Sequence, residues 1–599
     1  MSQSQIQETP LMEKIVSLCK RRGFIFQSSE IYGGINGFWD YGPLGAELKR
    51  NLRETWWRTM TREREDVVGL DATIIMHPAI WKASGHVDTF ADLMRECSVS
   101  NKRVRADHVE PQTGTAFRWT GATSKTTGWK SDKPASLLQR KGEHPDSVRK
   151  AARLFYSSGV AEAVLGKPED LELLGETTQP VQDSVDFHPE TGGALREAVP
   201  FNLMLRTFVG PTATEENITY LRPETAQAIF AQFKNVVDST RQKVPFGVCQ
   251  IGKAFRNEVT PRNYTFRSRE FEQMELEFFI APDEAIRIIH GSVAPWQEGA
   301  DLSTPQPNWG WEMWHRYWVA QRTAYYASIG LGADVLAYHW QQCDELAHYA
   351  RACVDILFKF PFGMEELEGI AARGNFDLSQ HQQHSGKSQE IFDEELRTAA
   401  GKLDDAAKAA FLAETADEWA ARAAKNNKPE AEARTAAKEF CEKLFKGQYI
   451  PHVIEPSAGL DRLALAVLAG AYHEEDKTDV NGKTERRTVL RFHPRVAPIK
   501  LGIFPLLKNK PDLVAKARGV YESLRSHLAC FYDETGAIGR RYARQDEAGT
   551  PFCVTIDFET LGEKGDDLKD TVTLRHRDDG RQERVKIAYL LGKLLPLVQ

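Results

Sequence analysis

The sequence predicts a multidomain α+β protein that ends in a small α/β domain. With 599 residues, the chain is too long for a single hydrophobic core. Two charged, strand-like segments, 252–258 and 271–279, flank a turn-rich loop, which predicts a hairpin between amphipathic helical segments. Strand-like and helix-like segments then alternate from residue 494 to residue 599, which predicts a separate α/β domain.

Several helices are predicted from periodicity. Residues 11–22 have a helical pattern, and a second helix begins at Pro43, because proline favours the first turn and apolar residues recur there at four-residue spacing. That apolar stripe could face the core of this chain or a partner subunit, and the spacing alone favours the core. Its members are Leu44, Leu48, Leu52 and Trp56, and further helices are expected over 147–156, 159–165, 310–328, 344–358, 511–529 and 584–595.

Two segments differ in character from the rest of the chain. Residues 109–197 are polar and rich in loop-forming residues, which indicates an insertion. Residues 388–447 are rich in alanine, lysine and glutamate, with high helix propensity but weak amphipathicity, which indicates solvated helices. For this second segment a spacer is favoured over a specific RNA-binding arm.

The composition is typical of a cytoplasmic protein. The net charge of −7 does not indicate a binder of polyanions, so any such site must be local. The N-terminus lacks the apolar segment of a secretory signal, and no apolar run is long enough to span a membrane. The 8 cysteines form no CxxC pair, so we expect free thiols and no zinc.

The familiar nucleotide and hydrolase motifs do not occur in the sequence. The segment His384–Ser388 ends like a P-loop but lacks the preceding glycine, and neither HExxH nor GxSxG is found. A bound nucleotide would therefore be held by cationic side chains.

The charged hairpin is the first candidate site. Alternation along 271–279 places Met274 and Leu276 on a face that meets a core, and Gln273 and Glu275 on the other face. Carboxylates placed in this way can hold an ammonium group or a metal ion, and the loop arginines can bind phosphate oxygens bidentately. A surface hairpin with weak cross-strand ion pairs explains the pattern equally well.

Two more segments carry the same mixture of charged and small residues. In LRPETAQAIF, Glu224 stands at the start of a helix. In HVIEPSAGLDRLAL, a strand ending in Glu455 is followed by a turn of small residues and a helix that carries Arg462. Each segment alone also fits an ordinary structural role.

Together these segments resemble the class II aminoacyl-tRNA synthetases. FRNE…FRSREFEQME resembles motif 2 of that family, PHVIEPSAGLDRLAL resembles motif 3, and YGPLGAELKRNL resembles motif 1. In detail the chain is similar to the homodimeric glycyl-tRNA synthetases, through SGHVDTFAD, RADH, FNLM, YLRPETAQAIF and GRRYARQDEAGTPFCVTIDF in the same order. The match spans the chain except for the two insertions.

The resemblance implies an α+β catalytic domain with an antiparallel sheet flanked by helices, and a C-terminal α/β anticodon-binding domain. It implies that glycine and ATP form glycyl-adenylate, from which the 3′-end of a glycine-specific tRNA takes the glycyl group. Mg²⁺ with the ATP and a homodimer without a membrane partner are implied as well. The domains would be 1–108 with motif 1, the insertion 109–197, 198–387 with motif 2, the insertion 388–447, 448–493 with motif 3, and the anticodon-binding domain 494–599.

The resemblance also implies roles on the ATP side. Arg256 matches the arginine that holds the α-phosphate and the glycine carboxylate, and Arg462 matches the motif 3 arginine near the base and the γ-phosphate. Glu258 matches the acid at the adenine amino group, Phe271 the aromatic that stacks under adenine, and Arg267 a ligand of the outer phosphates. The implied ATP-side residues are Arg256, Asn257, Glu258, Phe266, Arg267, Ser268, Arg269, Glu270, Phe271, Glu366, Leu367, Gly459, Leu460, Asp461 and Arg462.

On the glycine side, Glu224, Glu275 and Ser457 match the groups that hold the ammonium. Glu455 and Glu366 match acids near the phosphates and their magnesium. The implied glycine-side residues are Arg105, Glu224, Phe271, Glu272, Gln273, Met274, Glu275, Glu455, Pro456, Ser457, Ala458 and Gly459.

One further cluster lies near the C-terminus. Arg540, Arg541, Tyr542 and Arg544 would suit phosphates and unstacked loop bases of an RNA, although a solvated loop explains them too. Two other functions stay open for the whole chain. One is another adenylate-forming class II relative, such as a synthetase for a different amino acid or a tRNA-independent ligase. The other is a non-catalytic RNA-binding or regulatory paralogue, which would be expected to have lost some of the site residues.

Overall fold

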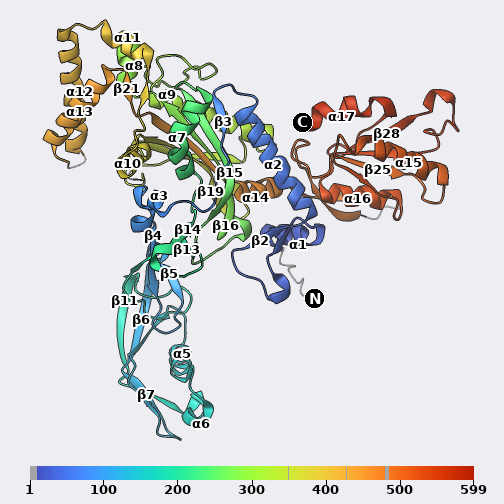
Figure 1. Cartoon of the computed structure of the whole chain (residues 1–599). Coiled ribbons are helices and arrows are strands. Elements are labelled where there is room, and N and C mark those ends of the chain that lie inside the picture. Colours follow the sequence, from blue (N-terminus) through green and yellow to red (C-terminus); the bar gives the residue numbers. More distant parts are fainter. Residues whose placement is uncertain (1–9, 348–349, 426–427, 479–483) are drawn as a thin grey trace. The chain divides into compact units, whose positions relative to one another are not determined.

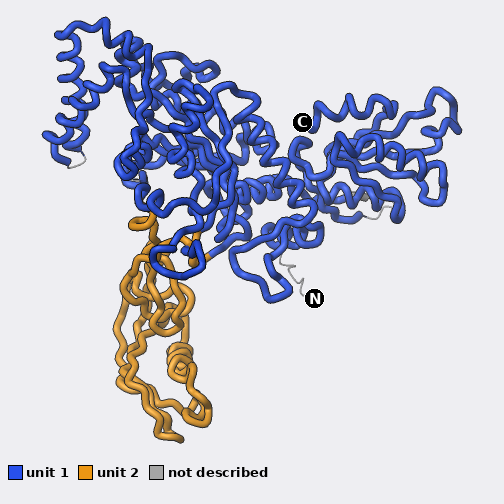
Figure 2. Tube along the Cα trace, viewed as in Figure 1, with its two compact units in different colours: residues 1–84, 206–255, 261–599 blue, residues 85–205, 256–260 orange. Residues whose placement is uncertain are grey.

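The computed structural model of the chain describes residues 10–347, 350–425, 428–478 and 484–599 (Figure 1). The chain divides into two compact units (Figure 2). The first unit comprises residues 1–84, 206–255 and 261–599, and the second comprises residues 85–205 and 256–260.

A seven-stranded sheet organises the first unit, with the strand order β17-β18-β19-β22-β16-β15-β3. All neighbours pair antiparallel except β15 and β3, which are parallel. The predicted antiparallel sheet is thereby confirmed. Its strands are β3 Val67–Gly69, β15 Phe246–Phe255, β16 Glu270–Ile280, β17 Leu336–Trp340, β18 Ala352–Phe360, β19 Gly363–Gly374 and β22 His452–Gly459.

Helices cover both faces of this sheet. One face packs against α1 (Leu11–Arg22), α2 (Pro43–Thr61), α9 (Trp311–Ser328) and α14 (Leu460–Ala471) in a single large core. The other face packs against α7 (Ala226–Thr240). The stripe of α2 is buried in the large core through Leu48, Leu52 and Trp56, so its predicted contact with the core is confirmed.

The segment predicted as solvated helices is helical. It forms α11 (Glu394–Gly401), α12 (Asp405–Lys425) and α13 (Glu430–Leu444) within the first unit. The remaining elements of this unit before residue 500 are β1 Ile25–Gln27, β2 Trp39–Tyr41, α3 Pro78–Ala83, β14 Ile218–Leu221, α8 Asp283–His290, α10 Phe376–Ser385, β20 Ile391–Phe392, β21 Gln448–Tyr449, β23 Tyr472–Thr478 and β24 Thr484–Leu490, while β13 Leu205–Phe208 begins in the second unit.

The second unit is built from three small sheets of three strands each, in the orders β10-β7-β8, β11-β6-β9 and β12-β4-β5. It extends beyond the predicted insertion, 109–197, at both ends. Its elements are α4 His86–Thr89, β4 Ala91–Glu96, β5 Arg103–Arg105, β6 Gln112–Trp119, β7 Gly121–Ser124, β8 Lys130–Ser131, β9 Ala135–Arg140, α5 Pro145–Ser157, α6 Glu162–Leu165, β10 Leu171–Leu174, β11 Thr177–Ser184 and β12 Val199–Asn202.

The C-terminal α/β domain has a five-stranded sheet of its own, in the order β26-β25-β27-β28-β29, and a separate hydrophobic core. Strand β25 pairs parallel with β26 and β27, whereas β28 and β29 continue the sheet antiparallel. The elements are β25 Leu501–Pro505, α15 Pro511–Leu524, β26 Cys530–Tyr532, α16 Ile538–Ala548, β27 Phe552–Ile556, β28 Thr571–His576, β29 Gln582–Lys586 and α17 Leu590–Val598.

Some predicted elements were wrong. The helix expected over 344–358 is in large part strand β18, because Val354, Ile356 and Phe358 are buried in alternation, a period of two rather than 3.6; residues 348–349 lie outside the described part. The helix expected over 584–595 begins only at Leu590, after strand β29. In the hairpin, β15 ends at Phe255, so 256–258 lie beyond the strand.

Among the residues that the structure describes, no helix has both the length and the apolar character needed to cross a membrane.

Candidate active site

Strand β16 presents two different faces, as its alternation predicts. Met274, Leu276 and Phe278 are fully buried in the large core on the side of α2, α9 and α14. The intervening residues Glu275 and Glu277 point to the opposite side, where neighbouring strands and the start of α7 surround them. The apolar face fixes the strand and so holds the carboxyl groups in place.

Glu275 is bound by groups from two other elements. The backbone N–H of Thr225 donates to its Oε2 at 3.1 Å, and the Thr225 hydroxyl donates to the same oxygen. The Ser457 hydroxyl of β22 donates to Oε1 at 3.1 Å. Thr225 is itself held by Gln273, whose Oε1 accepts from its N–H at 3.1 Å, and by Gln250, whose Nε2 donates to its carbonyl at 3.0 Å.

Glu455 lies beside Glu275 and binds an arginine. The Arg373 Nη1 donates to Glu455 Oε2 at 2.6 Å, while Nε and Nη2 of Arg373 donate to Asp377 at 2.9 and 3.0 Å. All of these groups are buried. The guanidinium is therefore shared between two carboxylates and cannot neutralise the whole site.

Three carboxyl groups, those of Glu275, Glu277 and Glu455, have oxygens within 4.8 Å of one another. The register on either side, Glu275 opposite Ser457 and Phe278 opposite Ile454, places Glu277 opposite Glu455. Burial raises the pKa of Glu455 to about 8, even though Arg373 opposes this change. Burial also raises the pKa of Glu275, and the nearby charge of Glu224 raises it further. The pKa of Glu277 is raised well above its ordinary value, mainly by burial. A cation entering this cluster would stabilise the ionised forms.

Glu224 adds a fourth carboxylate whose field reaches this cluster, as its effect on the pKa values of Glu275 and Glu455 shows. Its Oε1 accepts from Gln227 Nε2 at 3.1 Å. Gln227 is oriented by His381, whose Nε2 lies 2.9 Å from its Oε1, and by Asp377, whose Oδ1 accepts from its Nε2 at 2.9 Å. The acid thus belongs to the same buried polar network as Arg373.

Arg222 of the LRPE segment is a buried support of the site. Its Nε donates to the Lys253 carbonyl at 2.6 Å and its Nη1 to the Ala72 carbonyl at 3.0 Å. Gly252 of β15 leaves the space for it, because a Cβ at position 252 would lie 2.1 Å from Arg222 Nη2. The strand therefore needs glycine there for the guanidinium to fit.

A cation and an aromatic ring meet at the start of α14. The Arg462 guanidinium lies 4.4 Å from the centre of the Phe266 ring. Its Nη1 donates to the Glu366 carbonyl at 2.9 Å and is 3.3 Å from the Glu366 carboxylate. Phe266, Glu366 and Arg462, all predicted on the ATP side, are thus brought together.

Two predicted residues have a different setting, on the face of β16 that carries Met274. Lys49 of α2 lies 2.8 Å from the Glu272 carboxylate and 2.7 Å from that of Asp461. Arg53 also binds Glu272, at 2.8 Å, and the Glu272 N–H donates to Asp461 Oδ2 at 2.7 Å. The side chains of Glu272 and Asp461 thus join α2, β16 and α14 and do not face Glu275.

Other predicted residues contribute backbone or packing. Glu270 pairs with Lys253 at 2.6 Å, and Arg269 donates to the Asn36 carbonyl at 2.8 Å. The side chains of Met274, Pro456, Ala458, Leu367 and Leu460 are buried. Phe271 lies in β16 and Gly459 ends β22, whereas Arg267 and Ser268 lie in the hairpin loop before β16.

The second unit holds the remaining predicted residues. The Arg256 guanidinium lies 5.5 Å from the Phe90 ring centre, and the Asn257 N–H donates to the Leu203 carbonyl at 2.7 Å. Arg105 is 3.2 Å from Asp92 and 2.7 Å from Asp107, and the field of Glu258 also acts on it. Arg105 is therefore well neutralised by its own neighbours.

In the C-terminal domain, most side chains of the predicted RNA-binding cluster form contacts within the domain itself. Arg541 is buried and donates to the carbonyls of Pro505 and Gly536. Arg544 pairs with Asp533, and the Tyr542 hydroxyl lies 2.5 Å from that of Thr555. Arg540 is exposed.

Sequence reasoning missed several residues of the site. Thr225 follows the predicted Glu224 directly, so its place at the start of a helix was an available signal. Arg373 and Asp377 have a four-residue spacing, but Arg373 ends a strand, so only the fold brings it to Glu455. Gln250 and Gln227 carried no local signal.

Comparisons with known proteins agree with this architecture. Residues 212–298 match a family model described as "tRNA synthetase class II core domain (G, H, P, S and T)", and residues 500–596 match one described as "Anticodon binding domain". A glycine–tRNA ligase of Rhodopirellula baltica is 42% identical, covering 97% of this chain and 98% of the relative. Glycine–tRNA ligases of Thermus thermophilus (40%; 97% and 98%) and Treponema denticola (38%; 97% and 96%) are similar over comparable lengths. Given this identity over nearly the whole chain, the protein belongs to the glycine–tRNA ligase family of class II aminoacyl-tRNA synthetases.

Proposed function

We propose that this chain attaches glycine to its tRNA in an ATP-dependent reaction through glycyl-adenylate. The observation that carries the proposal is the buried cluster of Glu275, Glu277 and Glu455, on which the half-buried Glu224 also acts as a charge and beside which Arg373 is shared with Asp377. A small ammonium compound supplies the missing positive charge. The class II core and the anticodon-binding domain supply the context for adenylate and tRNA chemistry.

On the glycine side, we propose that the carboxylates of Glu224, Glu275 and Glu455 bind the ammonium group of glycine, with the Ser457 hydroxyl beside them. The hydrogen bonds from Thr225 and Ser457 fix the Glu275 carboxylate before the substrate arrives. Glycine has no side chain to grip, and one additional methylene changes binding by only about 1–3 kcal/mol. Selectivity therefore rests on crowding around the α-carbon by these buried side chains. Gln273 and Gly459, next along the same face, complete this side of the site.

On the ATP side, we assign charge neutralisation to Arg256 and Arg462, and stacking of adenine to Phe271. The position of Arg462 over Phe266 and against Glu366 supports a preorganised cation there. Glu258 is assigned to the adenine amino group and Arg267 to the outer phosphates. The wall around the ATP would be formed by Phe266, Asn257, Ser268, Arg269, Glu270, Leu367 and Leu460.

Magnesium would accompany the ATP. Mg²⁺ prefers carboxylate oxygens and keeps several waters, which suits a partly exposed acid. Glu366 fits this requirement because its side chain is half-exposed and lies against Arg462 at 3.3 Å. Glu455 fits it less well, since Oε2 is already bound by Arg373. When bound, the ion would neutralise phosphate charge; we propose no zinc.

The first step needs no general base, because the glycine carboxylate is already a nucleophile. A glycine carboxylate oxygen forms a bond to the α-phosphorus of ATP, and the bond from that phosphorus to pyrophosphate breaks. A terminal hydroxyl of the tRNA then forms an ester with the glycyl carbonyl carbon, the bond from that carbon to the phosphate oxygen breaks, and AMP leaves while the hydroxyl proton passes to the phosphate or to water. Both steps depend mainly on positioning and on cations that stabilise charge in the transition state.

Three further properties are proposed from the family resemblance. The chain would act as a homodimer, with α2 as the element that resembles the dimer-forming motif 1, and light scattering of the purified protein would test this. A cytoplasmic location and a glycine-specific tRNA as partner follow from the proposed role in translation.

The test of the function is pyrophosphate exchange into ATP, measured with each amino acid in turn. We expect exchange with glycine only, and none with glycine for Glu275→Gln, because the ammonium loses a charged partner. Exchange driven by serine or alanine would point to a relative for another amino acid, and a wild type without any exchange would point to a non-catalytic paralogue.

A further inference from the structure

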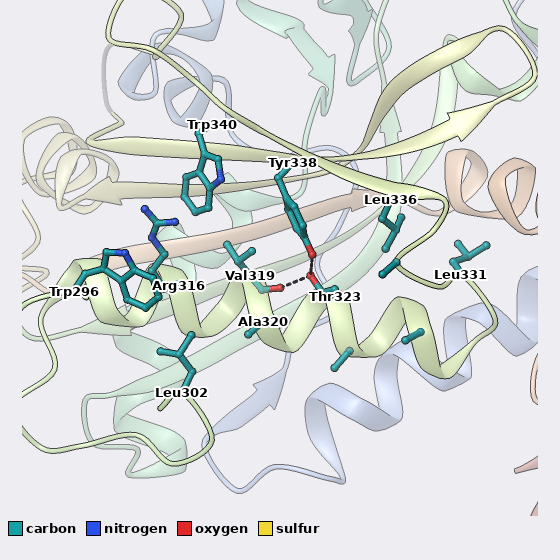
Figure 3. A pocket seen from close by; sticks show the side chains of 13 residues that line it. Trp296, Leu302, Arg316, Val319, Ala320, Thr323, Leu331, Leu336, Tyr338 and Trp340 are labelled. Atoms are coloured by element: carbon teal, nitrogen blue, oxygen red, sulfur yellow. Dashed lines mark hydrogen bonds between the residues drawn. The ribbon is translucent and has the colours of Figure 1, made fainter. Parts of the chain in front are cut away.

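A cavity of about 540 Å³ lies between helix α9, strand β17 and the loop that holds Trp296 and Leu302 (Figure 3). Its floor is formed by small residues of α9, among them Ala320, Ala324 and Ala327. Helix α9 packs on the face of the sheet that carries Met274, whereas Glu275 points to the opposite face, so the cavity is separate from the candidate active site. Its volume falls in the range of about 300–1,000 Å³ that is typical of small-molecule sites.

One end of the cavity holds a cation between two indole rings. The Arg316 guanidinium lies 3.7 Å from the ring centre of Trp340 and 4.9 Å from that of Trp296. Figure 3 shows its head group between these two side chains. Within the described part of the chain, no carboxylate forms an ion pair with Arg316. Burial lowers its pKa, and the charge of Glu312, one turn earlier on α9, opposes this change without forming an ion pair.

The two hydroxyl groups along the cavity already satisfy one another. The Tyr338 hydroxyl lies 2.9 Å from the Thr323 hydroxyl, which in turn donates to the Val319 carbonyl at 2.8 Å. The walls between Arg316 and Leu336 therefore offer apolar surface without a free donor or acceptor in need of a partner. An anionic ligand bound to Arg316 would therefore have apolar cavity walls next to the rest of its molecule.

We propose that this cavity binds an amphipathic monocarboxylate, with the carboxylate on Arg316 and an aliphatic body along the alanine floor of α9. The planar guanidinium matches a carboxylate bidentately, and its two indole neighbours hold it in one orientation. A triphosphate would need more cations than the single one at this end. The aliphatic part gains affinity by leaving water, about fourfold for each buried methylene.

The test is calorimetric titration of the full-length protein with octanoate, decanoate and the uncharged decanol, all below their micellar concentrations. We expect saturable binding of one decanoate per chain, tighter than octanoate by up to about fourfold for each added methylene. Decanol should bind roughly tenfold or more weakly than decanoate, because it lacks the charge-assisted hydrogen bonds to Arg316. Equal affinity for decanoate and decanol, or no saturable binding, would overturn the proposal.

Two variants test the guanidinium and the apolar floor of the cavity separately. Arg316→Met should weaken decanoate by about tenfold or more and leave decanol unchanged, whereas Ala324→Leu should weaken both by filling the floor. Arg518→Met is the matched control, since Arg518 stacks on Tyr532 at the same 3.7 Å but lies in the C-terminal domain. Decanoate binding by Arg316→Met as tight as by wild type would contradict the assigned role of the guanidinium. Glycine-dependent exchange, measured in parallel, reports separately on the active site.

Discussion

The carboxyl group of Glu277 is the least compensated polar group near the candidate site. It is fully buried, and neither of its oxygens has a hydrogen-bond partner in the described part of the chain. Burial and the charge of Glu455 both raise its pKa well above the ordinary 4.5. The folded protein therefore favours the protonated form of Glu277 more strongly than the unfolded chain does.

This difference gives a pH-dependent stability prediction for Glu277→Gln. Between pH 4.5 and the raised pKa, the folded wild type binds up to one proton more than the unfolded chain at this position, so its stability falls as pH rises, by up to about 1.4 kcal/mol per pH unit. The glutamine variant lacks that dependence. Its free energy of unfolding should match wild type near pH 4.5 and exceed it increasingly towards pH 7, as chemical denaturation at several pH values would show. A variant less stable than wild type at pH 7 would show that the carboxyl group is ionised and partnered there.

A second pH dependence belongs to substrate binding. Glu455, with a pKa of about 8, is largely protonated in the free protein at pH 6. The glycine ammonium prefers the ionised carboxylate, so binding at pH 6 must displace a proton that is largely gone at pH 8.5. The KM for glycine in pyrophosphate exchange should therefore fall between pH 6 and pH 8.5, with the KM for ATP as the internal control. A glycine KM that stays constant over this range would argue against Glu455 as an ammonium ligand.

At the scale of elements, Lys49 is the side chain that contacts both β16 and α14 from α2. Lys49 contacts both Glu272 and Asp461, and its side chain is only 11% exposed. These contacts connect the helix that resembles motif 1 to the strand of motif 2 and the helix of motif 3. The position of Arg462 on α14 relative to Glu275 on β16 thus depends on a buried ionic link.

Lys49→Met should destabilise the first unit by about 3–5 kcal/mol, because it removes the cation that pairs with the buried Asp461 carboxylate, while Glu272 keeps Arg53. Lys20→Met is the matched control, since Lys20 pairs with Glu30 at an exposed site and such pairs contribute only about 0–1 kcal/mol. Denaturation followed by tryptophan fluorescence would measure both. Equal destabilisation by the two variants would mean that Lys49 does not link the three elements.

Local patterns were sufficient for some elements and not for others. The alternation of β16 is encoded by neighbouring residues, so its two faces and the place of Glu275 could be predicted. The contact between Arg373 and Glu455 depends on the pairing of β19 with β22, which are far apart in sequence, so no local period announces it. Strand β18 was mistaken for a helix because charged residues before it mask the short alternation of Val354 and Ile356.

At the scale of the whole molecule, the candidate active site and the C-terminal domain are built on different hydrophobic cores. The residues that surround Glu275 belong to the sheet of the first unit, whereas the domain beginning at β25 has its own cluster of buried residues from Leu501 to Val598. Arg541, which the sequence placed among RNA-binding residues, serves that second core instead. Recognition of tRNA by the domain would then fall to exposed groups such as Arg540.

Removal of 499–599 should separate the two half-reactions. Glycine-dependent pyrophosphate exchange needs only groups outside that segment, so it should stay within a few-fold of the wild-type rate. Transfer of glycine to tRNA should fall by orders of magnitude, because the contacts of the anticodon-binding domain are lost and association with a polyanion depends on many such contacts. Circular dichroism of the truncated chain would establish that its sheet is intact, and Arg540→Ala in the full chain provides a milder second variant. Loss of exchange from a folded truncated chain would show that the C-terminal domain takes part in forming the adenylate.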